Sequence, residues 1–368
     1  MNILTLVKYY EPSKGGIETV AKNIITAISE NLNTQDTTVI CNNHQESNRD
    51  IVEFQDNVKI IRNKSFFWKS QPFSLGFTGL FSEIKNADII HHHYPYPTME
   101  LALLPFLSHL RTKKLIITWH ANISNSRWKK IERFYNFLIF KLLKVSNRIV
   151  VTSPQLLENS AILQQFKNKV VIIPLSFRPH KEINHPKSLP PTNEKVKLLF
   201  VGKMRAYKGL KYLLESIVDL NVELNIVGKG EEEINLRKYI KSRNLETKVF
   251  IHNDVSDDEL SGFYTNSHIF ILPSINEAEA FGVVQLEALS YGVPVINTNL
   301  KSGVPFVSLH GVSGFTVKPK NSEELRAAIL KLIENPVLYN EFSKNAIERA
   351  ESFTNDKMIE KYWKLYES

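Results

Sequence analysis

The chain has 368 residues, of which 43% are hydrophobic and 23% are charged, a balance typical of a folded globular protein and not of a disordered one. This length is more than one ordinary domain needs and fits two domains of roughly 150 to 190 residues each. The single cysteine excludes a disulfide framework, and with no signal-peptide pattern and no apolar run of membrane-spanning length we expect a cytoplasmic protein.

The net charge of +8 is unevenly distributed. Residues 1–180 hold 22 Lys and Arg against 13 Asp and Glu, a difference of +9, whereas residues 181–368 hold 24 against 25, a difference of −1. A basic first half suggests that this part of the protein meets an anionic surface. Nucleic acid is one such partner, but the sequence contains no recognisable nucleic-acid-binding module.

The first half alternates strand-like and helical segments. Residues 2–8 are expected to form a buried strand, and the Gly15-Gly16 loop leads into a helix whose apolar face starts at Ile17. Strand, glycine loop and helix in this order place backbone amides where a phosphate can bind, although an ordinary turn is the commoner explanation of two glycines. Further strands are expected at residues 37–41, 58–61, 88–92, 115–119, 148–152 and 170–173. This alternation predicts a doubly wound α/β domain with a parallel sheet.

Two groups of polar side chains follow strands of this domain, at the sheet edge where α/β proteins bind ligands. One is His91-His92-His93-Tyr94, and the other is His120. Adjacent residues on a strand point to opposite faces, so the three consecutive histidines are not expected to bind one metal ion. We expect His92, His93 and Tyr94 to line an acceptor site instead.

Residues 176–195 are rich in Pro, Lys, Asn and Ser and are expected to link a first domain, residues 1–175, to a second α/β domain, residues 196–352. The strand that opens the second domain is followed by Gly202-Lys203-Met204-Arg205-Ala206-Tyr207-Lys208-Gly209. A glycine and clustered cations between a strand and a helix suit a diphosphate, and a solvated basic loop is the alternative. Residues 322–351 are expected to be helical, and residues 353–368 to form a last amphipathic helix.

The most informative stretch runs from Pro273 to Pro294. It places an aromatic-glycine turn, Phe281-Gly282, just before an apolar helix, and it holds two carboxylates, Glu279 and Glu287. The backbone N–H groups at such a helix start suit an anion such as a phosphate, while the carboxylates can accept hydrogen bonds from neutral hydroxyls. This combination indicates a sugar-nucleotide site, and a solvated helix face is the alternative.

The string Glu279-Ala-Phe-Gly-x4-Glu287-Ala, followed by Gly292-Val-Pro-Val, resembles the E-x7-E signature of the retaining GT-B glycosyltransferases of family 4, the glycogen synthase-like group. Pro273-Ser274 before it and Gly314-Phe315 after it make the likeness more specific. The resemblance covers nearly the whole chain and is firmest over residues 200–318.

This resemblance implies the GT-B architecture, two Rossmann-like doubly wound domains facing across a cleft, with the last helix crossing back to the first domain. It also implies transfer of a sugar, with retention of anomeric configuration, from a UDP- or GDP-linked donor on the second domain to a hydroxyl of a glycan acceptor on the first. Similar enzymes build bacterial O-antigen, capsule and exopolysaccharide, so we expect an acceptor carried on a lipid such as a polyprenyl diphosphate.

Site roles follow from the same resemblance. Lys203 and Lys208 match the two cations of the family's G-R-x4-K-G clamp and, with Glu279 and His120, form the expected catalytic set. The family has an arginine at the position of Lys203, and lysine lacks the bidentate fork of arginine. Whether Lys203 or the nearby Arg205 takes the role of that arginine therefore stays open. The expected donor contacts are Gly16, Gly202, Arg205, Phe281, Gly282, Val283, Glu287 and His252. The expected acceptor contacts are Gly15, His92, His93 and Tyr94.

No D-x-D metal motif occurs in the sequence. We therefore expect the cationic clamp to replace a divalent metal, and no cofactor beyond the donor substrate. Retention is expected through attack on the leaving-group face, with the departing phosphate taking the acceptor proton; double displacement through an enzyme carboxylate is an alternative. Other interpretations of the chain are a GT-B sugar-nucleotide epimerase or a phosphorylase and, more remotely, a basic nucleic-acid-binding protein.

Two stretches of the first domain combine basic and apolar residues. Residues 64–81 carry six aromatic residues and two lysines without an acid, and residues 126–145 form a basic amphipathic helix candidate. Exposed basic and aromatic residues favour an anionic membrane surface. For the helix, which lies between two strands, packing of its apolar stripe on the sheet is the stronger expectation. We expect peripheral association of the first domain with the inner face of the cell membrane.

Overall fold

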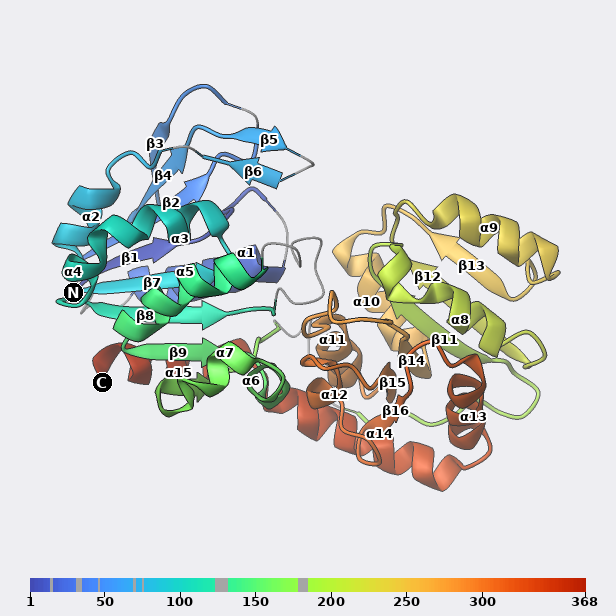
Figure 1. Cartoon of the computed structure of the whole chain (residues 1–368). Coiled ribbons are helices and arrows are strands. Elements are labelled where there is room, and N and C mark those ends of the chain that lie inside the picture. The colour runs from blue at the N-terminus through green and yellow to red at the C-terminus, as the bar shows by residue number, and fades with distance from the viewer. Residues whose placement is uncertain are drawn as a thin grey trace. The chain divides into compact units, whose positions relative to one another are not determined.

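The computed structural model describes residues 1–13, 16–30, 35–45, 47–68, 71–74, 76–122, 132–177 and 185–368. The chain divides into two compact units (Figure 1). Unit 1 consists of Met1–Leu175 together with Asn355–Ser368, and unit 2 of Ser176–Thr354. Each unit is a parallel sheet with helices on both faces, which confirms the predicted α/β class.

Unit 1 contains an eight-stranded sheet in the order β10-β9-β8-β7-β1-β2-β4-β3. Its neighbouring strands pair in parallel, except that β3 runs antiparallel to β4. The strands are β1 (Asn2–Leu6), β2 (Asp36–Asn42), β3 (Ile51–Gln55), β4 (Val58–Asn63), β7 (Ile89–Tyr94), β8 (Lys114–Trp119), β9 (Arg148–Val151) and β10 (Val170–Ile172). β3 was not expected from the sequence, because its side chains are largely exposed and carry little apolar alternation.

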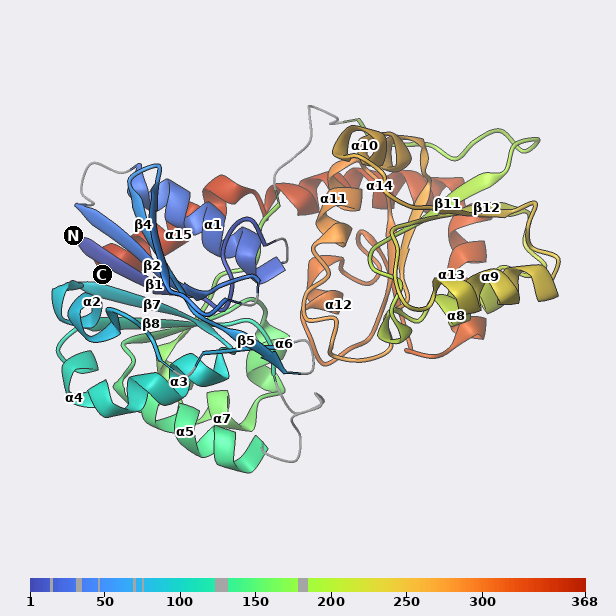
Figure 2. The same cartoon turned by 90° about the horizontal axis from the view of Figure 1, so that it is seen from above.

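Helices cover the two faces of this sheet (Figure 2). On one side lie α1 (Gly16–Ser29) and α15 (Asn355–Glu367), and on the other lie α2 (Leu80–Asn86), α3 (Pro97–Leu103), α4 (Leu107–Leu110), α5 (Glu132–Val145), α6 (Pro154–Glu158) and α7 (Ala161–Gln164). The expected apolar face of α1 is buried through Val20, Ala21, Ile24, Ile25 and Ile28. A separate pair of antiparallel strands, β5 (Phe66–Trp68) and β6 (Gln71–Phe73), lies within the aromatic stretch of residues 64–81.

The C-terminal helix α15 belongs to unit 1 by its contacts. The Tyr366 hydroxyl lies 2.7 Å from His91 Nδ1, and the Tyr362 hydroxyl lies 3.1 Å from Thr118 Oγ1. Lys114 Nζ donates to the Tyr366 carbonyl oxygen at 2.8 Å. These buried polar contacts fix the helix against β7 and β8, because separating them would leave polar groups unpaired in the core.

Unit 2 contains a six-stranded sheet in the order β13-β12-β11-β14-β15-β16, with every pair parallel. Its strands are β11 (Val196–Val201), β12 (Val222–Val227), β13 (Val249–His252), β14 (Ile269–Leu272), β15 (Val295–Thr298) and β16 (Gly314–Val317). Its helices are α8 (Leu210–Ser216), α9 (Glu233–Ser242), α10 (Asp257–Asn266), α11 (Val284–Ser290), α12 (Val304–Val307), α13 (Ser322–Ile333) and α14 (Pro336–Glu351). Because all the strands are parallel, the loops after them share one edge of the sheet.

Two details of unit 2 differ from the sequence-based expectation. The segment expected as one helical stretch, residues 322–351, is two helices, because Pro336 begins α14 and the Asn335 side chain caps it by accepting from the Leu338 N–H. Residues expected in a linker also contact the body of unit 2. Lys187 Nζ donates to the carbonyl oxygens of Tyr264, Thr265 and Ser267 at 2.6, 2.7 and 2.8 Å and so caps the end of α10.

Candidate active site

Two glycine loops meet backbone to backbone at the carboxyl edge of the unit 2 sheet. Gly202 follows β11 with a φ of 149°, and Gly228 follows β12 with a φ of 131°. A Cβ atom on Gly228 would lie 2.3 Å from the Gly202 carbonyl oxygen, so no larger residue fits there. Lys203 and Arg205 follow Gly202 on this loop, and both are exposed. The predicted cations therefore lie at the sheet edge where α/β proteins bind ligands.

The same loop folds back to bring Lys208 to the segment after β14. Lys208 ends a short 3-10 turn, Ala206–Lys208. Gly209 follows with a φ of 69°, and a Cβ atom on it would lie 2.1 Å from the Pro273 carbonyl oxygen. The Ile275 N–H donates to the Tyr207 carbonyl oxygen at 2.8 Å. These contacts hold the turn against the loop that carries Glu279.

Lys208 and Glu279 form a buried ion pair. Lys208 Nζ lies 2.5 Å from Glu279 Oε2, and the two side chains are 9% and 10% exposed. The same carboxylate oxygen accepts a hydrogen bond from Ser274 Oγ at 3.0 Å. Desolvation cancels much of the attraction in a buried pair, so stability alone explains it poorly. An ammonium has three donors and a carboxylate about four acceptor positions, which gives both groups capacity for a ligand as well.

The Phe281-Gly282 turn lies beside this pair. Gly282 has a φ of 74°, and a Cβ atom on it would lie 2.6 Å from Leu272 Cδ2. Phe281 is buried, and the Gly303 N–H donates to the carbonyl oxygen of Ala280 just before it at 2.7 Å. α11 then begins at Val284, directly after Val283. The turn is thus held from both sides and presents its backbone at a defined place.

Two buried amides that the sequence analysis missed hold this turn in place. Gln285 Nε2 donates to the carbonyl oxygens of Phe281 and Gly282 at 3.2 and 3.3 Å. Asn297 Nδ2, at the end of β15, donates to Gln285 Oε1 at 2.8 Å. The sequence signal was a lone Gln within an apolar helix, since a buried amide needs partners. Gln285 and Asn297 act as positioning residues.

Glu287 and His252 lie on different elements of unit 2, α11 and β13. Glu287 lies in the first turn of α11, half-buried, and its Oε2 accepts from the buried Tyr264 hydroxyl at 2.6 Å. His252 ends β13, and its Nε2 donates to Asn225 Oδ1 at 2.8 Å. Burial lowers the pKa of His252, with nearby Glu223 acting in the opposite sense. Their expected role as donor contacts stays a prediction.

Unit 1 brings His93 and His120 together at the ends of β7 and β8. His93 Nδ1 lies 3.0 Å from His120 Nε2, and the two rings stack with centroids 5.2 Å apart. His91 lies on the same face, between Thr118 Oγ1 and the Tyr366 hydroxyl. Within the described structure, His93 Nε2 and His120 Nδ1 are buried and have no hydrogen-bond partner. Such unpaired atoms in a buried site suit a bound ligand.

These histidines are neutral at physiological pH. Burial, with the nearby histidines, lowers the pKa of His91 and of His120 to about 3, and lowers the pKa of His93 well below its usual value. A neutral imidazole carries one donor and one acceptor. One proton is shared between His93 and His120, so the tautomer of either ring fixes that of the other.

Two of the predicted acceptor contacts require correction. His92 points to the opposite face from His93, is fully buried, and its Nε2 lies 3.0 Å from Glu100 Oε1. Tyr94 is also fully buried and stacks on Trp119 with ring centroids 3.6 Å apart. Strand alternation explains both cases, since every second residue of β7 faces the α2–α7 side. Their side chains pack on Glu100 and Trp119, on the face of the sheet opposite to the one that carries His93 and His120.

The glycine pair near the N-terminus is only partly described. Gly15 lies outside the described residues. Gly16 is the first residue of α1, is exposed, and has no neighbouring atom within 4 Å of where a Cβ atom would stand. Packing therefore does not explain the glycine at 16, and its predicted place against the donor stays a prediction.

Metal ligands are not gathered in the part of the chain that the structure describes: it contains no group of three or more His, Cys, Asp or Glu side chains suited to one ion. The His91-His92-His93 run behaves as the alternation predicted, with His91 and His93 on one face and His92 on the other. A metal role for this run has no support in the geometry.

Together, the fold and these sites define a two-domain α/β protein with cationic, carboxylate and imidazole groups at the carboxyl edges of its sheets. Comparison with known proteins makes the class specific. The model of the "Glycosyltransferase Family 4" domain matches residues 14–177, and that of "Glycosyl transferases group 1" matches residues 181–349. The chain is 30% identical over its whole length to O-antigen chain mannosyltransferase C of Escherichia coli, covering 98% of that protein.

Two further similarities agree with this match. D-rhamnosyltransferase WbpZ of Pseudomonas aeruginosa is 30% identical over 76% of this chain and 73% of its own length. Anabaena HepE in complex with UDP has a similar structure, with a TM-score of 0.73 over the full length of both chains and 18% sequence identity. The chain belongs to the family 4 glycosyltransferases and has their GT-B fold.

The geometry of the ion pair leads to a prediction for Glu279. Replacing it in Glu279→Gln keeps the shape and the contact with Ser274 but removes the charge beside Lys208. We expect kcat to fall by roughly 10² or more, because the carboxylate fixes the reacting sugar and its cationic partner. Steady-state kinetics with a circular dichroism check on folding measures this.

Glu277→Gln, two residues earlier in the same loop, is the matched control and should keep its kcat. A folded Glu279→Gln protein with the kcat of the unaltered chain would remove Glu279 from the catalytic set.

Proposed function

We propose that this glycosyltransferase moves a sugar from a nucleoside diphosphate donor to a hydroxyl of a glycan acceptor, with retention of anomeric configuration, in the synthesis of a bacterial surface polysaccharide. The observation that carries the proposal is the buried Lys208–Glu279 pair beside two glycine turns at the carboxyl edge of unit 2. The full-length similarity to an O-antigen chain mannosyltransferase supports the polysaccharide pathway. The UDP bound to the structurally similar HepE supports a nucleotide donor.

Unit 2 would hold the donor. Lys208, with the exposed Lys203 and Arg205, supplies positive charge to the diphosphate, while the Gly202 and Gly282 turns let the backbone approach it. Glu279 accepts hydrogen bonds from the sugar hydroxyls, and Glu287 from the ribose. His252 lies where the nucleobase is expected. Because the Lys208 ammonium already contacts Glu279, one interaction orients both the phosphate-binding and the sugar-binding group.

Unit 1 would hold the acceptor, with His93 and His120 as its polar contacts. Their unpaired nitrogens, His93 Nε2 and His120 Nδ1, offer one donor and one acceptor to hydroxyls. Since both rings are neutral, they orient hydroxyl groups and do not act as cationic acids. The acceptor itself is proposed to be a glycan carried on a lipid.

The reaction we favour breaks the bond between the sugar C1 and the β-phosphate oxygen and forms a bond from C1 to the acceptor oxygen on the same face. The acceptor proton passes to the departing phosphate oxygen, so protons balance without an enzyme base. Negative charge builds on the β-phosphate as it leaves, and Lys203 and Lys208 stabilise it. A double displacement would need an enzyme carboxylate as nucleophile, and Glu279 is already engaged with Lys208 and Ser274.

A nucleotide-release assay with UDP-, GDP- and ADP-sugars tests the function, with and without an acceptor and with EDTA or MgCl₂. We expect release that depends on the acceptor and continues in EDTA, because the lysines supply the charge that a metal would bring. Turnover lost in EDTA and restored by magnesium would refute the metal-independent mechanism.

The same assay separates the alternatives. Conversion of one sugar nucleotide into its epimer without acceptor would indicate an epimerase, and glycan breakdown by inorganic phosphate would indicate a phosphorylase. Either result would replace the proposed transfer.

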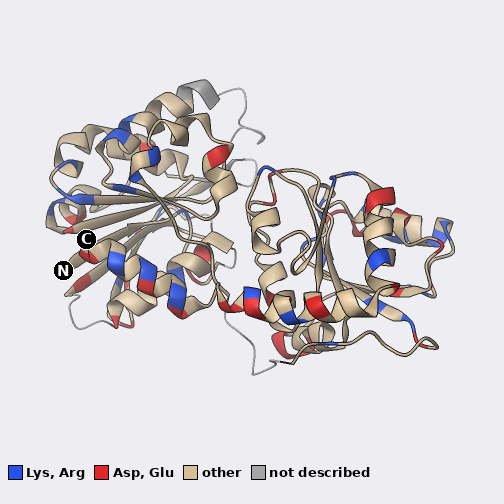
Figure 3. Ribbon diagram, turned by 90° about the horizontal axis from the view of Figure 1, so that it is seen from below, with Lys and Arg blue, Asp and Glu red and all other residues tan. Residues whose placement is uncertain are grey.

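Membrane association is a further part of the proposal. Among the described residues, no helix has the length and apolar character needed to cross a bilayer. Unit 1 does have an apolar hollow of about 750 Å³, and Phe81 and Leu101 on it are each 47% exposed. The hollow is lined by residues 74, 76, 77, 79–82, 98, 101, 102, 105 and 106. Lys and Arg as well as Asp and Glu occur in both units (Figure 3). The apolar hollow, with the exposed side chains of Phe81 and Leu101, is the lipid contact that we propose.

For the double variant Phe81→Ser/Leu101→Ser we expect weaker co-sedimentation with liposomes that contain an anionic lipid, and weaker binding of the unaltered chain at high salt. Val337→Ser, which changes a residue of unit 2 that is 79% exposed, is the control and should bind normally. The membrane proposal would be contradicted if liposome binding were the same with and without the anionic lipid and the same for the double variant and the unaltered chain. The expected lipid contacts of Phe67, Trp68 and residues 126–131 concern side chains outside the described residues.

A further inference from the structure

Unit 1 has a second cavity at the amino ends of its strands. Its volume is about 720 Å³, within the range of small-molecule sites. The carboxyl ends, where His120 follows β8, are the opposite edge of the same parallel sheet. The cavity is therefore distinct from the proposed acceptor contacts.

The sheet register gathers polar side chains on one wall of this cavity. Asn2 of β1 is paired with Asp36 of β2, and Thr38 of β2 with Lys59 of β4. Phe54 of β3 is paired with Lys59 across the antiparallel hairpin. Paired residues on neighbouring strands face the same side of a sheet, so this wall follows from the strand register.

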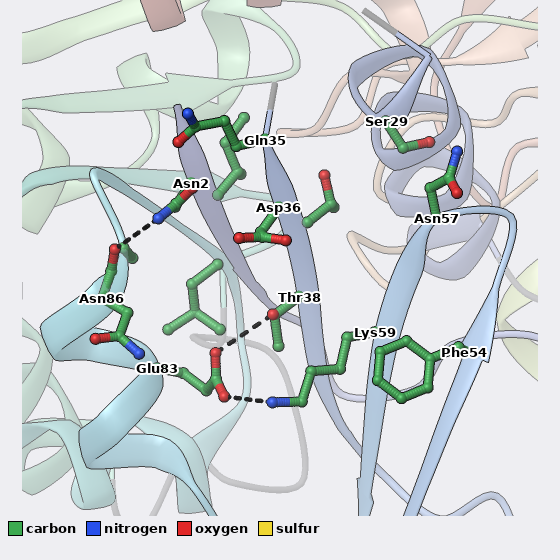
Figure 4. A pocket seen from close by; sticks show the side chains of 14 residues that line it. Asn2, Ser29, Gln35, Asp36, Thr38, Phe54, Asn57, Lys59, Glu83 and Asn86 are labelled. Carbon is green, nitrogen blue, oxygen red and sulfur yellow. Dashed lines mark hydrogen bonds and ion pairs between the residues drawn. The ribbon is translucent and has the colours of Figure 1, made fainter. Parts of the chain in front are cut away.

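Helix α2 lines one side of the cavity and contributes the carboxylate of Glu83 to it (Figure 4). Glu83 Oε1 lies 2.7 Å from Lys59 Nζ, and Glu83 Oε2 accepts from Thr38 Oγ1 at 3.3 Å. Lys59, the one basic side chain among the described residues of the lining, is thus neutralised. Asp36 is exposed and lies between Asn2 and Thr38. An anionic ligand such as a phosphate or nucleotide is disfavoured by this balance.

The remaining groups suit hydroxyls. Four amide side chains line the cavity together with Asp36, and amides and carboxylates together both donate to and accept from hydroxyl groups. These amides are Asn2, Gln35, Asn57 and Asn86. At the rim, the Phe54 side chain is 77% exposed, an unusual state for a phenylalanine. The negative face of an aromatic ring packs well against the C–H groups of a sugar.

We infer that this cavity binds a neutral glycan segment, with Phe54 stacking on a sugar ring and Asp36 accepting from its hydroxyls. The inference rests on the proposed function, because it makes the ligand an already built part of the acceptor chain. A glycan held at the amino edge stays with the enzyme while its end is extended at the other edge. Effective concentration then favours repeated transfer to the same chain.

The test uses the full chain and a direct binding measurement. α-Mannotetraose and a tetrasaccharide of D-rhamnose are titrated by calorimetry, and hydrogen exchange locates the bound glycan. We expect protection of residues 51–59, and about tenfold weaker binding at this site in Phe54→Ala and in Asp36→Asn, which corresponds to ~1.4 kcal/mol. Phe137→Ala is the matched control, since this phenylalanine of unit 1 is also exposed, at 58%, but is outside the cavity lining.

Binding unchanged by both substitutions, no protection of residues 51–59, or binding of GDP or inorganic phosphate in the cavity would each overturn the inference. Failure of the proposed function has a different signature. If no nucleotide is released from any sugar-nucleotide donor but the glycan still protects residues 51–59, the transferase proposal fails and the cavity inference is supported. If transfer proceeds while Phe54→Ala and Asp36→Asn leave glycan binding and product length unchanged, the transferase stands and the cavity inference fails.

Discussion

The buried ion pair between Lys208 and Glu279 is the interaction on which the geometry of the donor site depends. It joins two loops from different strands, and the close approach of Gly209 to Pro273 makes the pairing possible. Burying two charges costs several kcal/mol per ion before their attraction is counted. A pair retained at such a cost, at the ligand-binding edge of a parallel sheet, is better explained by function than by stability. The buried amides of Gln285 and Asn297 hold the neighbouring Phe281-Gly282 turn, and function again explains these buried polar groups better than stability does.

The two units contribute different chemistry. Unit 2 concentrates charge, through Lys203, Arg205, Lys208 and its two carboxylates, whereas three buried histidines of unit 1 are neutral, namely His91, His93 and His120. This division agrees with a reaction in which the phosphate leaving group takes the proton itself. A mechanism with a histidine as general base would need a pKa nearer to neutral than about 3. The histidine pair is therefore assigned to binding and orienting hydroxyls.

Sequence reasoning predicted the features that depend on local pattern. The α/β class followed from alternating periodicity, the GT-B fold from the Glu279 to Glu287 signature, and both are confirmed. Sequence reasoning could not predict the ion pair between Lys208 and Glu279, because the two residues are 71 positions apart and their contact depends on the packing of two loops. The pairing of His93 with His120 was hidden for the same reason. His92 and Tyr94 were misjudged because a strand end was treated as open on both faces.

The most direct test of the account is the affinity of nucleoside diphosphates, measured by calorimetry with both UDP and GDP. The affinity for a nucleoside diphosphate that carries no sugar should depend on Lys208 but not on Glu279. The account predicts that Glu279→Gln keeps the Kd of the unaltered chain for the tighter of the two nucleotides. The double variant Lys208→Met/Glu279→Gln, which leaves no unpaired buried charge, should bind roughly tenfold or more weakly, as expected for a lost charged hydrogen bond. Equal affinity of the double and single variants, both folded, would contradict the claim that Lys208 binds the diphosphate.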